Sequence, residues 1–112
     1  MSLEMSKISV VIALRNRSGT RLANCVRSLR WQSVPEAEVE IVLSDFGSAQ
    51  DHAESVSALA AAHNCVVVQT ATNEVWNRSR ALNIGLQAAT APMVMCTDAD
   101  MIFDPRFLQN VL

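Results

Sequence analysis

Residues 8–14 read Ile-Ser-Val-Val-Ile-Ala-Leu, and Arg15-Asn16-Arg17 follows them directly. A short apolar run rich in β-branched residues predicts a strand that is buried on both faces, as in a parallel sheet. Polar side chains directly after such a strand lie where parallel sheets bind ligands, at the carboxyl ends of their strands. This stretch therefore predicts both the architecture of the chain and the position of its site.

Short apolar runs recur along the rest of the chain and alternate with helical stretches. This alternation predicts a parallel sheet with right-handed crossovers. The fold class is therefore α/β, a Rossmann-like parallel sheet with alternating helices, in a single domain over residues 1–112. The further strands are predicted at 39–44, 65–69 and 93–97.

The helices are predicted from apolar residues that share one face and from capping residues that precede them. Leu22, Val26 and Leu29 give the inner face of the first helix, with Thr20 as its cap. The later helices are predicted at 51–63 with Val56, Leu59 and Ala60 inward, at 78–89 with Asn77 as cap and Leu82 and Leu86 inward, and at 104–112 with Asp104 as cap and Pro105 in the first position.

Composition excludes several classes of protein. The net charge is −2 and aromatic residues are scarce, so we expect no nucleic-acid partner. The cysteines, Cys25, Cys65 and Cys96, form no C-x-x-C pair and lie in apolar stretches, which predicts buried free thiols, a reducing compartment and a cytoplasmic location. The longest apolar run is too short to span a bilayer.

Asp98 and Asp100 directly follow the last predicted strand. Residues two apart in extended chain point the same way, so these like charges repel unless a cation or water separates them. A hard divalent ion, Mn²⁺ or Mg²⁺, held by one or two carboxylates and phosphate oxygens fits this spacing. The alternative is a solvated acidic turn. An EF-hand is excluded, because the segment lacks the turn glycine and the final glutamate.

Basic residues converge on the same edge of the predicted sheet. Arg15 and Arg17 follow the first strand, and Arg78 and Arg80 open the third helix. Guanidinium groups bind phosphate oxygens in a bidentate manner, which predicts a phosphate ligand, such as a diphosphate bound with the metal. The alternative is that these arginines are scattered and solvated. For two further residues near this edge, Asp45 and Trp76, the sequence leaves two interpretations open. Asp45 either accepts hydrogen bonds from a ribose or base or forms an Asx turn, and Trp76 either stacks on a base or packs under its loop.

These motifs together resemble the donor-binding half of GT-A glycosyltransferases, broadly the family 2 group. Ala13-Leu14-Arg15-Asn16-Arg17 and the segment 76–85, each followed by Asp-x-Asp, are most similar to β-1,4-galactosyltransferases and chondroitin-synthase-like enzymes. The resemblance spans residues 8–108. Two positions depart from the pattern: Ala13 replaces the usual proline, and Phe46 stands where family 2 enzymes often carry a second aspartate.

The resemblance implies a role for each matching residue. Asp100 would bind the metal directly and Asp98 would support it. The residues that would contact the nucleotide-sugar donor are Ala13, Leu14, Arg15, Arg17, Asp45, Trp76, Arg78, Asp98 and Ala99. In the family, the acceptor site, the catalytic base and a further metal ligand lie beyond the position of Leu112, so this domain would be incomplete at its C-terminus and no catalytic residue is assigned.

The implied activity is a metal-dependent, inverting transfer of a sugar from a UDP-sugar to a hydroxyl of a glycan or other acceptor. The main alternative is a module that binds a nucleoside diphosphate without turnover. A nucleotidyltransferase is disfavoured because the loop after the first strand has a single glycine, Gly19. The resemblance leaves membrane association open, and an exposed sheet edge would favour a homo-oligomer.

Overall fold

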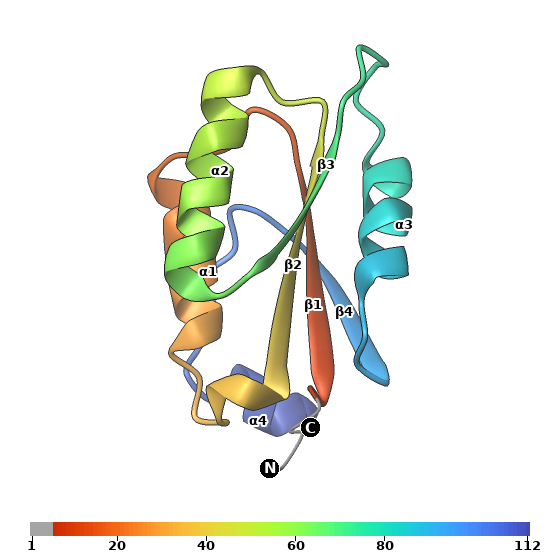
Figure 1. Cartoon of the computed structure of the whole chain (residues 1–112). Helices are drawn as coiled ribbons and strands as arrows, with labels where there is room; N and C mark the ends of the chain where they lie inside the picture. The colour runs from red at the N-terminus through yellow and green to blue at the C-terminus, as the bar shows by residue number, and fades with distance from the viewer. Residues whose placement is uncertain (1–5) are drawn as a thin grey trace.

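The computed structural model describes residues 6–112 and confirms the predicted α/β architecture (Figure 1). Its sheet has the order β3-β2-β1-β4, and every neighbouring pair is parallel. Successive strands are added outward from β1 on one side, and then β4 is added on its other side. The order of the strands therefore reverses between β1 and β4, and open α/β sheets bind ligands at such a point. The strands are β1 (Ile8–Leu14), β2 (Val39–Phe46), β3 (Val66–Thr70) and β4 (Met93–Asp98).

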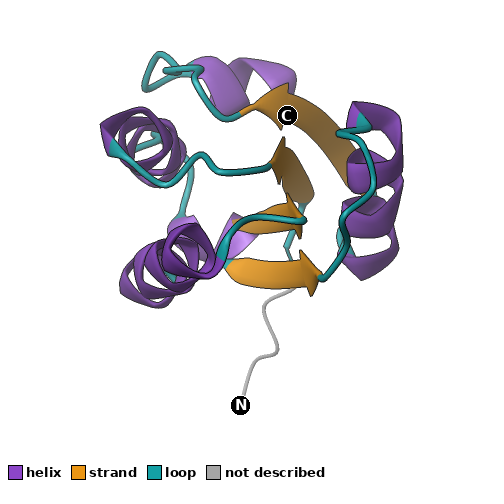
Figure 2. Cartoon of the chain, turned by 90° about the horizontal axis from the view of Figure 1, so that it is seen from above, coloured by secondary structure: helices purple, strands orange, loops and turns teal. Residues whose placement is uncertain are grey.

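Helices cover both faces of the sheet, which gives three layers. Helices α1 (Thr20–Arg30) and α2 (Gln50–His63) lie on one side of the strands, and α3 (Arg78–Ala88) lies on the other (Figure 1, Figure 2). Two short helices complete the fold, the 3-10 helix η1 (Glu36–Glu38) and α4 (Phe107–Val111).

The core lies on the two faces of β1, whose seven residues are all buried. Ile8, Val10, Ile12 and Leu14 pack with the side chains of α1 and α2. Val11 and Ala13 face α3, where they meet Val42, Phe46, Ala81 and Leu82. The prediction of a first strand buried on both faces is therefore confirmed. Because side chains alternate along a strand, successive residues of β1 face opposite layers of helices.

Helix α3 packs on the sheet through smaller residues than the sequence predicts. Ala81, Leu82 and Gly85 are buried, whereas Leu86 is 37% exposed, so the prediction that Leu86 faces inward is wrong. A Cβ on Gly85 would lie 2.5 Å from Cγ1 of Val11 and 3.1 Å from Cβ of Ser44. The helix thus approaches the sheet through its glycine, and this rotates Leu86 toward solvent.

The capping predictions have mixed outcomes. Asn77 caps α3 as predicted, because its side-chain oxygen accepts a hydrogen bond from the backbone N–H of Arg80. Thr20 does not cap α1, because it is the first helical residue. The N-cap position is Gly19, which has no side chain to accept a hydrogen bond. Helix α1 thus begins at the residue that was expected to precede it.

The last helix begins later than predicted. It starts at Phe107 rather than Asp104, and Asp104 and Pro105 lie in the preceding turn, where the Asp104 carboxylate accepts from the backbone N–H of Arg106. Gln32, just after α1, supplies the missing cap: its side-chain oxygen accepts from the N–H of Leu108, and its amide donates to the carbonyl of Asp104. This partner is too distant in sequence to be predicted.

The cysteines differ in burial. Cys25 is buried, Cys65 is half-buried, and Cys96 is exposed, so the prediction of a buried thiol is wrong for Cys96. That residue lies on β4, an edge strand on which Met93 and Val94 are also exposed. Burial raises the pKa of the Cys25 thiol to about 11. Among residues 6–112, no helix is both long enough and apolar enough to cross a membrane.

Candidate functional site

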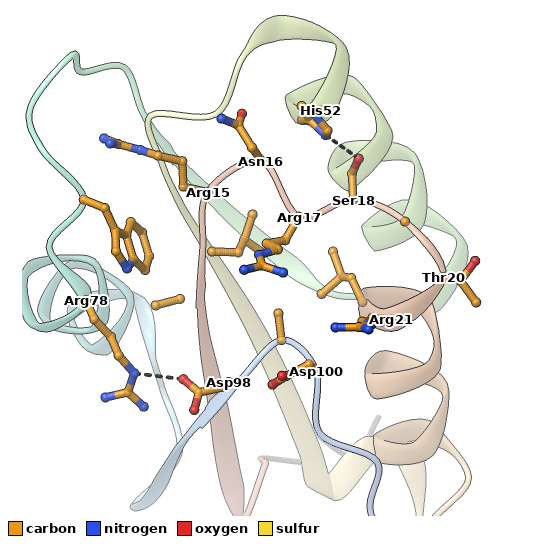
Figure 3. A pocket seen from close by; sticks show the side chains of 16 residues that line it. Arg15, Asn16, Arg17, Ser18, Thr20, Arg21, His52, Arg78, Asp98 and Asp100 are labelled. Carbon is orange, nitrogen blue, oxygen red and sulfur yellow. Dashed lines mark hydrogen bonds and ion pairs between the residues drawn. The ribbon is translucent and has the colours of Figure 1, made fainter.

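A cavity of about 650 Å³ opens at the carboxyl ends of β1 and β4, where the strand order reverses (Figure 3). Its walls come from four segments distant in sequence: the end of β1 with the loop into α1 and the first turn of that helix, His52 on α2, the residues around the start of α3, and the end of β4 with the turn that follows. Eight of the nine residues predicted to contact the donor line it, together with the predicted metal ligand Asp100. The lining residues are Ala13, Leu14, Arg15, Asn16, Arg17, Ser18, Gly19, Thr20, Arg21, Leu22, His52, Trp76, Arg78, Asp98, Ala99 and Asp100.

Asp98 and Asp100 occupy one wall, at the end of β4 (Figure 3). The guanidinium of Arg78, from the start of α3, donates from Nε to Oδ1 of Asp98 at 2.8 Å. Both side chains are about half-exposed. One of the two clustered carboxylates is therefore paired with an arginine, which reduces the repulsion between them.

These two carboxylates suit one kind of metal binding. In the described part of the chain, no group of three or more His, Cys, Asp or Glu side chains is placed to hold a metal. These residues therefore do not supply a complete set of protein ligands for a metal ion. A hard divalent ion that keeps several waters and takes one or two carboxylates plus substrate phosphates needs no such cage. Asp98 and Asp100 fit an ion of that kind.

Arg15 and Trp76 line another part of the cavity, and both contact Phe46. Arg15 donates from Nε to the carbonyl of Phe46, and its Cζ lies 5.3 Å from the centroid of the Phe46 ring and 5.9 Å from that of Trp76. The Phe46 and Trp76 rings meet edge to face at 6.3 Å. Phe46 is buried, whereas the Trp76 side chain remains 40% exposed and lines the cavity.

Asp45 is the one predicted donor-binding residue that does not line the cavity. It is 2% exposed, and its Oδ1 accepts from the backbone N–H of Ser48 at 3.1 Å, which is the Asx turn that the sequence left open. Its Oδ2 is buried without a hydrogen-bond partner among residues 6–112. A role for Asp45 in donor binding stays a prediction.

The structure adds cavity residues that sequence reasoning missed. Ser18 and His52 both line the cavity, and the Ser18 hydroxyl lies 2.8 Å from Nδ1 of His52. Thr20 and Arg21, in the first turn of α1, line it as well. No spacing rule links Ser18 to a histidine on α2, because the two residues are brought together only by packing of α2 beside the β1–α1 loop. In the sequence, His52 has no partner residue at the spacing of a metal or catalytic site, so it was not predicted as a site residue.

Asn16 fixes the shape of the loop that precedes these residues. Its backbone has a φ of 54°, in the left-handed region that asparagine tolerates. Its backbone N–H donates to the hydroxyl of Ser48, and its side-chain oxygen accepts from the N–H of Ala49. The loops after β1 and β2 are therefore tied together, and this holds Arg15 and Arg17 on either side of a fixed bend.

Comparison with solved structures supports this architecture. S. aureus TarS is 26% identical with a TM-score of 0.80, over 94% of this chain and 18% of that one. A 1–349 form of TarS in complex with UDP-GlcNAc matches at the same identity and TM-score and is covered over 30% of its length. The mannosyltransferase PcManGT from Pyrobaculum calidifontis, in complex with GDP-Man and Mn²⁺, matches in fold at 23% identity and a TM-score of 0.74, over 91% of this chain and 30% of that one.

The chain thus spans less than a third of the length of these structures. No curated protein matches it. The sequence model of the family described as "Glycosyl transferase family 2" matches residues 9–112, which is nearly all of the chain. The predicted closer likeness to β-1,4-galactosyltransferases is not tested by these matches. The chain belongs to glycosyl transferase family 2.

Proposed function

We propose that this chain is the donor-binding part of a glycosyltransferase that transfers a sugar from a UDP-sugar to a hydroxyl of a glycan or other acceptor. The observation that carries the proposal is the arrangement of charge in the cavity at the β1–β4 switch point. Two carboxylates, Asp98 and Asp100, lie in one wall, and three exposed arginines, Arg17, Arg21 and Arg78, line the same space. A diphosphate with a bound divalent ion matches both sets of charge.

Further support comes from the family and from one relative. Family membership extends over the segment that forms the cavity. TarS matches 94% of the length of this chain, and one of its structures is a complex with UDP-GlcNAc. A uridine nucleotide is accordingly our proposal for this chain, with the exposed face of Trp76 packing against the base.

In this proposal Asp100 binds Mn²⁺ or Mg²⁺ and Asp98 supports it. When bound, the ion would stabilise the negative charge that develops on the leaving nucleoside diphosphate. Arg17 and Arg78 contribute to the same stabilisation, because fixed cations act where charge increases in the transition state. The acceptor hydroxyl attacks the anomeric carbon with inversion, and its proton goes to a carboxylate that we do not place among residues 6–112.

Calorimetric titration of the chain with UDP in the presence of Mn²⁺ tests this proposal. We expect a saturable one-to-one binding curve that disappears when a chelator removes the ion. GDP and CDP, titrated under the same conditions, measure how well the cavity distinguishes the base. Equal binding of all three nucleotides would contradict a uridine-specific site, and equal UDP binding with and without chelator would contradict metal dependence.

A second measurement separates transfer from simple binding. Incubation of UDP-GlcNAc and other UDP-sugars with the chain and Mn²⁺, followed by detection of released UDP, reports turnover. Binding of UDP without any release from the donors, including in the presence of hydroxyl acceptors, would favour the module that binds a nucleoside diphosphate without turnover. Release of UDP would favour the transferase.

A further inference from the structure

The side chain of Arg15 is half-buried and is held by groups of the protein itself. Its Nε donates to the Phe46 carbonyl, and its guanidinium lies over the rings of Phe46 and Trp76. Its Nη2 atom is buried and has no hydrogen-bond partner among the described residues. The labelled side chain in Figure 3 points away from Asp98 and Asp100, toward the loop that precedes α3.

Gly47 shows how little space surrounds this guanidinium. Its φ is 85°, a conformation that favours glycine, and a Cβ at this position would collide with Nη2 of Arg15 and lie 2.7 Å from the carbonyl oxygen of Thr72. Its backbone N–H donates to the carbonyl of Thr70 at 2.9 Å. Arg15 is thus held between the end of β2 and the loop of residues 71–77 that carries Trp76.

The neighbouring arginines are placed differently. Arg17 is exposed, and the Arg78 side chain is 50% exposed. Both can turn toward a ligand without breaking a contact with the core. Arg15 would have to leave two aromatic rings and a carbonyl to do so, and the Phe46 carbonyl would lose its side-chain partner.

We infer that Arg15 is a positioning residue, which fixes the indole of Trp76 in the cavity wall and does not itself contact the donor's diphosphate. A guanidinium over a ring attracts its electron-rich face, and the planar group spans both rings as an ammonium does not. The indole is then presented to the base in one orientation, which lowers the cost of ordering it on binding. The last step rests on the proposed function; the fixing of Trp76 does not.

Fluorescence of Trp76 tests the positioning without any nucleotide. The chain has two tryptophans, and Trp31 is 73% exposed, so Trp31→Phe leaves Trp76 as the single reporter. In this background Arg15→Met should increase quenching of Trp76 by acrylamide roughly twofold, as expected if a side chain that is 40% exposed becomes free in solvent. Arg17→Met is the matched control, which removes a charge from the same loop and should leave quenching unchanged.

Two further variants keep the test decisive if Arg15→Met unfolds. Arg15→Lys keeps the charge but not the planar group and should give intermediate quenching. Gly47→Ala leaves Arg15 intact but displaces its guanidinium and also meets the Thr72 carbonyl, so it should raise the quenching of Trp76, and a rise there supports the inference only together with a rise in Arg15→Lys. Circular dichroism confirms that each variant is folded. Unchanged quenching in the folded variants would overturn the inference.

A double-mutant cycle with UDP and Mn²⁺ then separates positioning from direct contact. If Arg15 acts through Trp76, Arg15→Met weakens UDP binding in the native background and has no further effect in Trp76→Ala. An equal loss of affinity in both backgrounds would mean that Arg15 contacts the ligand directly, and the inference would be wrong. If the unaltered chain does not bind UDP, the proposed function fails, while the quenching result still decides whether Arg15 positions Trp76.

Discussion

Nε of Arg78 lies 2.8 Å from Oδ1 of Asp98, so the first residue of α3 is joined to the last residue of β4 across the cavity. The pair is half-exposed, and an ion pair of this kind contributes only about 0–1 kcal/mol to stability. Its placement therefore matters more for the ligand than for the fold. It holds a guanidinium beside the proposed metal and diphosphate before either binds.

Replacing Arg78 with methionine should weaken binding of UDP with Mn²⁺ by about tenfold or more, because a hydrogen bond to a charged group contributes roughly 1.5–3 kcal/mol. The melting temperature should hardly change. Arg80→Met is the matched control. Arg80 lies on the same helix, its Nε is 3.6 Å from Oε2 of Glu74, and it does not line the cavity. Calorimetry and thermal unfolding of both variants check this, and equal losses of UDP affinity would count against a specific role for Arg78.

Gly85→Ala should destabilise the chain by about 1–3 kcal/mol, the usual cost of overpacking a core. The new Cβ would lie 2.5 Å from Cγ1 of Val11, on the buried strand β1. Gly19→Ala is the control, because a Cβ at Gly19 would meet nothing within 4 Å and the φ of that residue is −91°. Urea denaturation measures both. Similar unfolding free energies for the two variants would show that α3 is not held as close to the sheet as described.

Asn77→Ala should lower the free energy of unfolding by about 1 kcal/mol, the typical cost of losing an N-cap. The variant removes the hydrogen bond from the N–H of Arg80 to the Asn77 side chain. Asn77→Ser offers an equivalent acceptor and should restore most of the stability. If serine and alanine destabilise equally, the contribution of Asn77 comes from something other than capping.

Glu40 predicts a dependence of stability on pH. Burial raises the pKa of its carboxyl. Hydrogen bonds from the Ser9 hydroxyl and from the backbone N–H and hydroxyl of Thr90 lower this pKa by more, so the net pKa falls below its ordinary value of 4.5. A depressed folded-state pKa gives stability that is present above the unfolded pKa and is lost as the pH falls through the folded one. Unfolding free energies measured from neutral pH downward should therefore decline below about pH 4.5, less steeply in Glu40→Gln. Parallel curves for the two proteins would contradict this.

The sequence predicted the architecture because the periodicity of buried strands is local information. Each run of β-branched residues became a strand within two residues of its predicted ends, and the carboxyl ends of β1 and β4 hold the predicted site residues. The same local reasoning found the cap at Asn77, whose partner is three residues away.

The sequence could not predict features that depend on packing between distant segments. Leu86 turns outward because Gly85 meets Val11, and α4 begins late because Gln32 caps it. The contact of Ser18 with His52 and the enclosure of Arg15 by Phe46 and Trp76 likewise join residues more than thirty positions apart. Motif reasoning grouped the arginines by charge, whereas the structure separates them by burial.

In the proposed function, Asp100 holds a divalent ion together with the diphosphate of a uridine nucleotide. Calorimetric titration of Asp100→Asn with UDP and Mn²⁺ tests it most directly, with Asp104→Asn as the control, since Asp104 lies four residues further on and outside the cavity. We predict that Asp100→Asn abolishes the Mn²⁺-dependent part of UDP binding while Asp104→Asn binds like the unaltered chain. Mn²⁺-dependent binding of normal affinity in Asp100→Asn would show that Asp100 does not hold the ion.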